Sequence, residues 1–503
     1  MNSQKIWQDL VTTAFIGTQK QSLNLSVGND SLSNILKKIN IDNNNPEKKL
    51  LQTAGILSIY HQVGQKPITK INDKIEPCQK EKLPICSDNL KQSLSTILNG
   101  EYKEILPECL QLIHKNKTLI PERFLSIILD KGKDNIELRP LIISIIGERG
   151  KWLAQYNQNW DYIISEFDQQ LWETGSRNLR LALIKNLRQQ DPQKARQLIE
   201  DTWKQEKSDL KQKFLDILEL NLSAEDETFL ELAFNDRSKY VKQKAAFLLG
   251  KIEDSNLCQR MIKRLTPCLI FTSGDNPSLE VILPEEYTSA MEKDCIIEKP
   301  IIKKQGNKAW WLEQMLQKVS PQYWCDTWGI SPETLLKLAQ GIWKKTLLES
   351  FAIASVNHKH FASAKILLDQ YLLIINRNTV IQLLNLLSYE EQQNILLELL
   401  QSDQEPLKSS SLILNLLKDY KKPWSNELSL AFISHLITTL ETTQDNYDWS
   451  LRLMFNDFAN YISPLFYQEI SDNFANLKKT PIYWTQNIED FLSRLQFRRQ
   501  MYK

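Results

Sequence analysis

The sequence predicts an all-α protein: a HEAT-like α-solenoid of stacked antiparallel helix pairs, with a non-helical insert near residues 266–307. The chain of 503 residues has only 14 glycines and 18 prolines, which favours helix over turns. Apolar residues recur at helical spacing through most of it, and expected helix starts fall about 15 residues apart, as in HEAT-like repeats. Helix pairs this short must stack on neighbours to bury their apolar faces.

The repeat unit is clearest between Leu220 and Ile252. Ser223 with Asp226 predicts a capping-box start of its first helix, and residues 235–238 predict a tight turn. The apolar sides of the two helices are expected to be Phe229, Leu230, Leu232 and Ala233 in the first, and Val241, Ala245, Leu248 and Ile252 in the second.

Four segments are expected along the chain. Residues 1–88 hold N-terminal helices at 5–17 and 50–63, a loop over 21–34, and an irregular polar stretch from 65 to 88. HEAT-like repeats follow over 89–265, with helix starts near 176, 191, 206, 224, 238 and 254. Residues 266–307 form an inserted arm with β-branched clusters, prolines and a turn that suggests a hairpin. Helical repeats return over 308–503.

Caps and breakers mark several boundaries. We expect a helix from Pro121 closed by Gly132, and another from Pro140 closed by Gly147. Ser320-Pro321 and Ser331-Pro332 are N-cap and first-turn pairs, and Ser388 with Glu391 is a second capping box. The last helix is expected over roughly 484–501.

Charge and cysteine content limit the function classes. Lysines and arginines total 62 against 61 acids, a balance that argues against a dedicated nucleic-acid binder. Seven cysteines without a CxxC pair predict reduced thiols in the cytoplasm. The N-terminus lacks a signal peptide, and the longest conspicuous apolar run, Leu141–Ile146, is too short to span a bilayer. We therefore expect a cytoplasmic protein with no membrane partner.

The most distinctive short string runs from Gly147 to Trp152 and includes the candidate binding residues Glu148, Arg149, Lys151 and Trp152. Two glycines around an acid–base pair predict a tight bend that presents a functional surface. The structural interpretation, which we favour, is that Gly147 and Gly150 make the turn, Trp152 packs, and Glu148 and Arg149 form a structural pair. It is not a phosphate loop, because the GK[ST] ending is missing.

Arginines supply a second candidate surface. Arg177, Arg180 and Arg188 are expected close to one face of one helix, and with Arg149 and Lys151 they form a possible basic patch for phosphate or an acidic partner. Solvated helix faces have the same pattern. Asp236 and Arg237 are candidate binding residues too, although the interpretation we favour is that the aspartate caps a helix and the arginine bonds a neighbouring repeat.

Tryptophans and histidines are interpreted structurally. The 13 tryptophans mostly lie among apolar residues at helical spacing, which favours core packing over a base-binding groove. His358 and His360 resemble a pair of metal ligands, but residues two apart on a helix point to different sides. No metal, cofactor or catalytic residue is predicted.

Several blocks resemble a bacterial HEAT-like family catalogued only as a domain of unknown function. The specific blocks are ERGKWLA and DRSKYVKQKAA, with WQDLVTTAFIGT and KAWWLEQMLQKVSPQYW similar to its other blocks. The resemblance covers most of the chain and is looser beyond about residue 350. Genes of the family often lie near those of SWIM zinc-finger proteins, MoxR-type AAA ATPases and von Willebrand factor A proteins. The resemblance therefore implies a partner in an ATPase-linked assembly and implies no catalytic residues.

Repeat patterns without catalytic motifs predict a non-enzymatic scaffold that mediates protein–protein interaction. The family resemblance implies that this assembly includes a MoxR-type ATPase. One alternative is a helical-repeat nucleic-acid-binding or DNA-repair protein of the glycosylase type, which requires a continuous basic groove with an exposed tryptophan and a carboxylate. A second alternative is a HEAT-like lyase, which requires an acid or a cysteine in a pocket.

Overall fold

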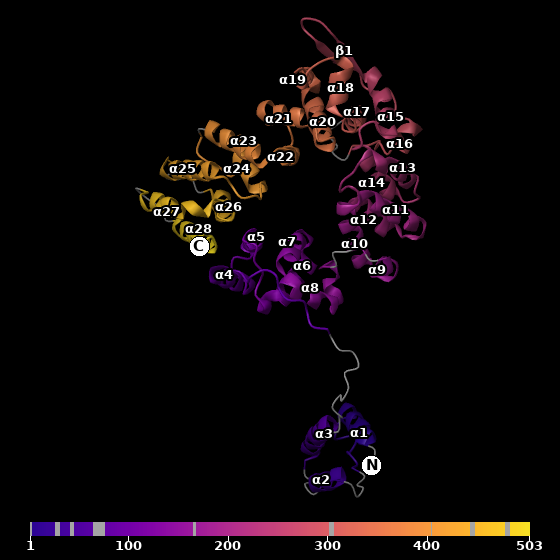
Figure 1. Ribbon diagram of the computed structural model, residues 1–503, viewed down its shortest axis with the longest axis vertical. Coiled ribbons are helices and arrows are strands. Elements are labelled where there is room, and N and C mark those ends of the chain that lie inside the picture. Colours follow the sequence, from indigo (N-terminus) through magenta and orange to yellow (C-terminus); the bar gives the residue numbers. More distant parts are fainter. Residues whose placement is uncertain are drawn as a thin grey trace. The chain divides into compact units, whose positions relative to one another are not determined.

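The computed structural model describes residues 3–25, 31–40, 45–63, 76–163, 167, 169–300, 306–403, 405–442, 448–477 and 483–503 (Figure 1). The chain divides into two compact units, Met1–Pro77 and Cys78–Lys503. The predicted segments 89–265, 266–307 and 308–503 all fall within the second unit. Within the described residues the secondary structure is helical apart from one two-stranded sheet and one isolated bridge, which confirms the predicted all-α class.

The first unit has its own small core. Its helices are α1 (Ser3–Ile16), α2 (Ser31–Asn40) and α3 (Pro46–Val63). Gly17 ends α1 with φ +95°. The loop predicted over 21–34 is wrong for residues 31–34, which belong to α2. This helix forms because Leu32 and Leu36, four residues apart, pack together with Leu57 in the core. Residues 64–75 of the expected irregular stretch lie outside the described part of the chain.

The second unit begins with helices that pack around one hydrophobic core. In order they are α4 (Asp88–Leu98), η1 (Lys103–Ile105), α5 (Leu106–Lys115), η2 (Glu122–Phe124), α6 (Leu125–Asp134), η3 (Ile136–Leu138), α7 (Arg139–Ile145), α8 (Gly147–Gln155) and η4 (Gln158–Ile163). Gly132 does not close α6 as expected, because it is buried inside the helix. A Cβ there would lie 2.2 Å from the Tyr162 hydroxyl, so glycine makes room for that side chain.

A second, longer core extends through the next repeats. They comprise α9 (Gln169–Thr174), α10 (Arg177–Gln190), α11 (Pro192–Thr202), η5 (Trp203–Gln205), α12 (Ser208–Leu218), η6 (Ala224–Asp226), α13 (Glu227–Phe234), α14 (Lys239–Leu249) and α15 (Asn256–Leu265). The predicted helix starts between 176 and 254 are confirmed to within two residues. The Asp226 carboxylate accepts a hydrogen bond from the Ser223 N–H at 3.0 Å, as the capping pattern predicts. Leu232, however, is 42 % exposed, so its expected burial is wrong.

The insert contains the expected hairpin. It holds η7 (Thr266–Cys268), β1 (Leu269–Thr272), β2 (Ser278–Val281) and α16 (Ser289–Lys293). The strands pair antiparallel, with Leu269 opposite Val281 and Thr272 opposite Ser278. Phe271 stacks on Trp328 at a centroid distance of 5.1 Å, so the hairpin is packed against the helices that follow. Residues 301–305 at the end of the insert lie outside the described residues.

Helix pairs resume after the insert. They are α17 (Asn307–Leu316), α18 (Pro321–Trp328), α19 (Pro332–Lys337), η8 (Gly341–Trp343), α20 (Lys344–Asn357), α21 (Phe361–Gln370), α22 (Arg377–Leu386), α23 (Tyr389–Ser402), α24 (Leu412–Asp419), α25 (Asn426–Thr442), α26 (Trp449–Phe458), η9 (Pro464–Phe466), α27 (Tyr467–Ala475) and α28 (Thr485–Met501). The Ser388 capping box is confirmed, since the Glu391 N–H donates to the Ser388 hydroxyl and the Ser388 N–H donates to the Glu391 carboxylate.

Alternate helices stack on one another in two layers, as in a solenoid. α20, α22, α24, α26 and α28 follow one another in one layer, and α23, α25 and α27 follow one another in the other. The array then closes, because α28 packs on α4 at the start of the same unit (Figure 1). Phe497 of α28 stacks on Tyr102 with ring centroids 4.6 Å apart, and Met501 is buried in the core of the first helices.

A buried ion pair fixes this closure. Arg498 of α28 donates through Nε and Nη2 to the Glu108 carboxylate of α5, at 2.5 and 2.8 Å. Its Nη1 donates to the carbonyls of Ala459 and Ile462, which follow α26. The Tyr502 hydroxyl also donates to Glu108, at 2.8 Å. We call this group of contacts between α28 and α4–α5 the seam. Across the described part of the chain, no helix is both long enough and apolar enough to cross a membrane.

Candidate functional site

The Gly147–Trp152 bend is the start of α8, and its backbone is already occupied by an acid of the same chain. The Glu81 carboxylate accepts hydrogen bonds from the N–H groups of Glu148 and Arg149, both at 2.9 Å. An acid at this position satisfies unpaired helix N–H groups and complements the helix dipole. Gly147 has φ +64°, and a Cβ there would lie 2.4 Å from the carboxylate, so glycine permits this cap.

The side chains of the bend form local contacts. Arg149 pairs with Glu122 at 2.6 Å, and Lys151 pairs with Glu148 at 3.0 Å. Trp152 packs edge-on against Tyr156, with ring centroids 5.2 Å apart. The geometry agrees with the expected turn and packed tryptophan, but the expected Glu148–Arg149 pair is wrong, because Arg149 reaches Glu122 and Glu148 binds Lys151 one helical turn on. A binding role for these residues stays a prediction.

The arginines of α10 do not form the expected common face. Arg177 pairs with Asp209, and Arg180 pairs with Glu206 at 2.5 Å, both acids lying at or next to the start of α12. The Arg180 guanidinium also lies over the Trp172 ring, 4.4 Å from its centroid. Acidic partners thus neutralise both charges, which weakens the nucleic-acid alternative that needs a continuous basic groove.

Arg188 does not lie on the predicted basic face of α10. Its side chain is fully buried and pairs with the buried Asp226 carboxylate at 2.5 Å. Its guanidinium also donates to four backbone carbonyls, those of Pro192, Leu218, Leu220 and Asn221. The arginine thereby ties α10 to the end of α12 and the start of the next repeat. Four positions before it lies the buried Ile184, a spacing that placed Arg188 on the apolar stripe of α10.

Asp236 has the structural role that the sequence favoured, and Arg237 does not. The Asp236 carboxylate accepts from the Ser238 N–H at 2.9 Å, in the turn that leads into α14. It also pairs at 2.7 Å with Lys211 of α12, so the bond to the neighbouring repeat comes from the aspartate. Arg237 is exposed and forms no hydrogen bond or ion pair with the residues that the structure describes.

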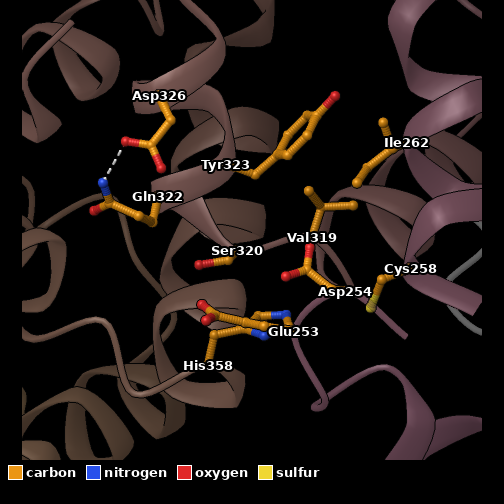
Figure 2. Close-up of a pocket in the computed structure, with 10 residues that line it drawn as sticks. All are labelled: Glu253, Asp254, Cys258, Ile262, Val319, Ser320, Gln322, Tyr323, Asp326 and His358. Carbon is orange, nitrogen blue, oxygen red and sulfur yellow. Dashed lines mark hydrogen bonds between the residues drawn. The ribbon is translucent and has the colours of Figure 1, made fainter. Parts of the chain in front are cut away.

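A pocket that the sequence did not predict lies between α15, α18 and the end of α20. It has a volume of about 130 Å³. Figure 2 shows the residues that line it, which are Glu253, Asp254, Cys258, Ile262, Val319, Ser320, Gln322, Tyr323, Asp326 and His358. Three separate segments of the chain, around residues 253–262, 319–326 and 358, meet here, so no short motif could identify the pocket.

His358 and His360 have separate roles, but they lie in the turn between α20 and α21, so the expected separation by helix geometry does not apply. His360 is the N-cap of α21: its Nδ1 accepts from the Ser363 N–H, so its Nε2 carries the proton that is shared with Gln322 at 2.9 Å. The Lys318 carbonyl accepts from the Cys258 thiol at 2.9 Å and also interacts with the His358 ring, whose other nitrogen has no hydrogen-bond partner among the described residues. Burial lowers the pKa of His358, although Glu253 opposes the shift, so the ring is neutral at pH 7.

The lyase alternative requires an acid or a cysteine in a pocket. Cys258 lies in this pocket, but its thiol is not activated. Burial raises the pKa of its thiol to about 11. A thiol that stays protonated at neutral pH is a poor nucleophile. Like the other six cysteines, it is a free thiol. The pocket therefore holds no activated cysteine, but its carboxylates meet the lyase alternative's requirement for an acid, and that alternative stays a prediction.

Comparison with known proteins identifies a family and no function. Searches of curated proteins and of solved structures gave no match. The model of a family of unknown function, DUF5691, matches residues 9–503. This range includes both compact units almost entirely, and it agrees with the resemblance seen in the sequence blocks. The chain therefore belongs to the DUF5691 family.

Proposed function

We propose that this protein is a non-enzymatic helical-repeat scaffold that binds partner proteins. The observation that supports it is the exposure of large apolar side chains on α1 and α3, two helices of the first unit that pack together. Phe15 is 89 % exposed, Val63 80 % and Leu51 69 %. Exposed apolar surface of this kind marks sites of protein association, because burying it against a partner is favourable.

The second unit complements this role. Stacked helix pairs present long, solvent-facing surfaces, and proteins built from such repeats use them for recognition. Its arginine–carboxylate pairs hold the layers together, and we assign them to stability rather than to chemistry. Free thiols are expected in a reducing compartment, which supports a cytoplasmic location. On the family resemblance we propose a MoxR-type AAA ATPase, a von Willebrand factor A protein or a SWIM zinc-finger protein as the partner.

Affinity purification from native bacterial lysate tests the proposal. The full chain is compared with a variant that carries Phe15→Ser, Leu51→Ser and Val63→Ser. The matched control carries Ile342→Ser and Leu373→Ser in the second unit, where the side chains are 87 % and 86 % exposed. All five positions are exposed, so each variant is expected to fold.

We expect one of the three named partner classes to co-purify with the wild-type chain and the control, and to be lost from the first-unit variant. Capture that is equal for all three chains would remove α1 and α3 as the binding surface. Absence of every named class from the wild-type purification would count against the scaffold assembly itself.

A further inference from the structure

The pocket between α15, α18 and α20 contains polar groups that the fold does not use. Ser320 is only 7 % exposed, and its hydroxyl has no hydrogen-bond partner among the residues that the structure describes. In Figure 2 this hydroxyl points to the side on which Gln322 and the Glu253 carboxylate lie. Ser320 precedes α18 as its N-cap residue, yet its side chain does not cap the helix. A buried hydroxyl without a partner is unfavourable, so the Ser320 side chain indicates a group that binds a ligand.

The mouth of the pocket is negatively charged. Glu253, Asp254 and Asp326 line it, and none of them forms an ion pair with a described residue. Asp326 accepts only from the Gln322 amide at 2.7 Å, and Asp254 accepts from Gln259 at 3.4 Å. No lysine or arginine is among the described residues that line the pocket. The unbalanced charge attracts a cation.

The arrangement does not suit a metal ion. In the described part of the chain, no three His, Cys, Asp or Glu side chains converge closely enough to hold one. The carboxylates instead lie around a space of about 130 Å³, where a single water needs only roughly 10–15 Å³. The Tyr323 side chain also lines the pocket.

We propose that this pocket binds a small organic cation with several N–H donors, an alkylammonium or guanidinium group. Glu253 and Asp326 supply the negative charge, and the Ser320 hydroxyl and the acceptor nitrogen of His358 receive N–H groups. The cation can come from a lysine or arginine side chain of another protein or from a free amine. The proposal does not depend on the scaffold function, since a free amine would bind without any protein partner.

Titration calorimetry on the full chain with n-butylammonium, and with n-butanol as the neutral analogue, tests it. We expect n-butylammonium to bind and n-butanol not to bind. Glu253→Gln is expected to weaken n-butylammonium binding about tenfold, because it removes a charged hydrogen-bond acceptor. Ser320→Ala should also weaken it, and this change does not remove a helix cap. The matched control is Glu285→Gln, at an exposed acid that lies outside the pocket.

A second arm separates the two sources of the cation. A blocked glycine peptide with one central lysine is titrated beside the same peptide with norleucine. Selective binding of the lysine peptide, weakened by Glu253→Gln, assigns the pocket to a side chain of a partner protein. Binding of n-butylammonium alone assigns it to a free amine. The proposal is overturned if n-butylammonium does not bind, if n-butanol binds equally well, or if Glu253→Gln and Ser320→Ala leave the affinity unchanged.

Discussion

Two buried arginines, Arg188 and Arg498, perform the same local task at very different distances along the chain. Each guanidinium binds one carboxylate. Each also donates hydrogen bonds to backbone carbonyls at or just after the end of a helix, because those carbonyls have no N–H partner within the helix. Arg188 and Asp226 are 38 residues apart and join consecutive repeats, whereas Arg498 and Glu108 are 390 residues apart. The first pair therefore supports one layer of the array, and the second decides whether the array is closed.

The environment of the two carboxylates also differs. The Asp226 side chain is fully buried, whereas that of Glu108 keeps 15 % of its surface in solvent. When a fully buried charge loses its partner, no water can take the partner's place, so the folded state is strongly destabilised. The comparison teaches that loss of Arg188 should weaken the whole second unit, while loss of Arg498 should act mainly on the seam.

The largest effect is expected for Arg188→Met. Removal of the guanidinium leaves the buried Asp226 carboxylate with only the Ser223 N–H at 3.0 Å and Arg196 at 3.2 Å, together with several unpaired carbonyls. We expect the free energy of unfolding to fall by about 3–5 kcal/mol, measured by urea denaturation. Adding Asp226→Leu should recover part of the loss, because it removes the stranded charge. A loss below about 1 kcal/mol would contradict the assignment of this pair to the core.

A smaller effect is expected for Arg498→Met. The free energy of unfolding should fall by about 2 kcal/mol, since Glu108 retains the Tyr502 hydroxyl and some water. Hydrogen exchange should accelerate in α4 and α28 and stay unchanged in α13 and α14, because repeats depend mainly on their neighbours. Equal acceleration of hydrogen exchange in α4, α28, α13 and α14 would contradict the prediction that Arg498 acts mainly on the seam.

Alkaline pH should act on the seam and spare the Arg188 layer. Burial, together with the adjacent Glu108 charge, raises the pKa of Tyr502 above its usual value near 10. Above that pH the unfolded chain loses a proton that the folded chain keeps, so seam stability is complete below about pH 10 and declines as the pH rises further. Tyr502 is 46 % exposed, so solvent screening keeps the loss below about 1 kcal/mol. Hydrogen exchange in α28 against pH measures this decline, and Tyr502→Phe should abolish it.

The smallest effect is expected for Arg177→Met, which repeats the chemical change of the first variant at an exposed pair. Arg177 and Asp209 have side chains that are 46 % and 57 % exposed. The change in the free energy of unfolding should stay within about 0–1 kcal/mol, measured under the same urea conditions. A loss comparable with that of Arg188→Met would show that burial does not separate these pairs.

The repeat architecture could be predicted because its signals are short-range. Helix starts from α10 to α15 follow from capping residues and apolar spacing, which lie within single repeats. The closure of the array could not be predicted, because the Glu108–Arg498 pair has no local signal at either residue. Leu232 was expected in the core on apolar character alone, and its exposure shows that spacing near a helix end does not fix which side faces the neighbours.

The candidate sites were predictable to a lesser degree. The bend at Gly147 was expected, but its ion pair was assigned to Glu148 and Arg149, whereas Glu148 pairs with Lys151, three residues on along the helix. By contrast, Glu81 reaches the start of α8 from more than sixty residues away, and the pocket around Ser320 gathers residues from three distant helices. Such groups meet only after the layers stack, so composition and spacing could not identify them.

The most direct test of the closed array is an intramolecular cross-link across the seam. Lys503 lies with Glu101 and Tyr102 around one surface hollow, and Lys103 follows Tyr102 in the chain. An amine-reactive cross-linker applied to the monomeric full chain should join Lys503 to Lys103, and Arg498→Met should reduce the yield. A Lys503–Lys103 cross-link that is absent from the monomer, or found only in dimers, would contradict a second unit that closes on itself.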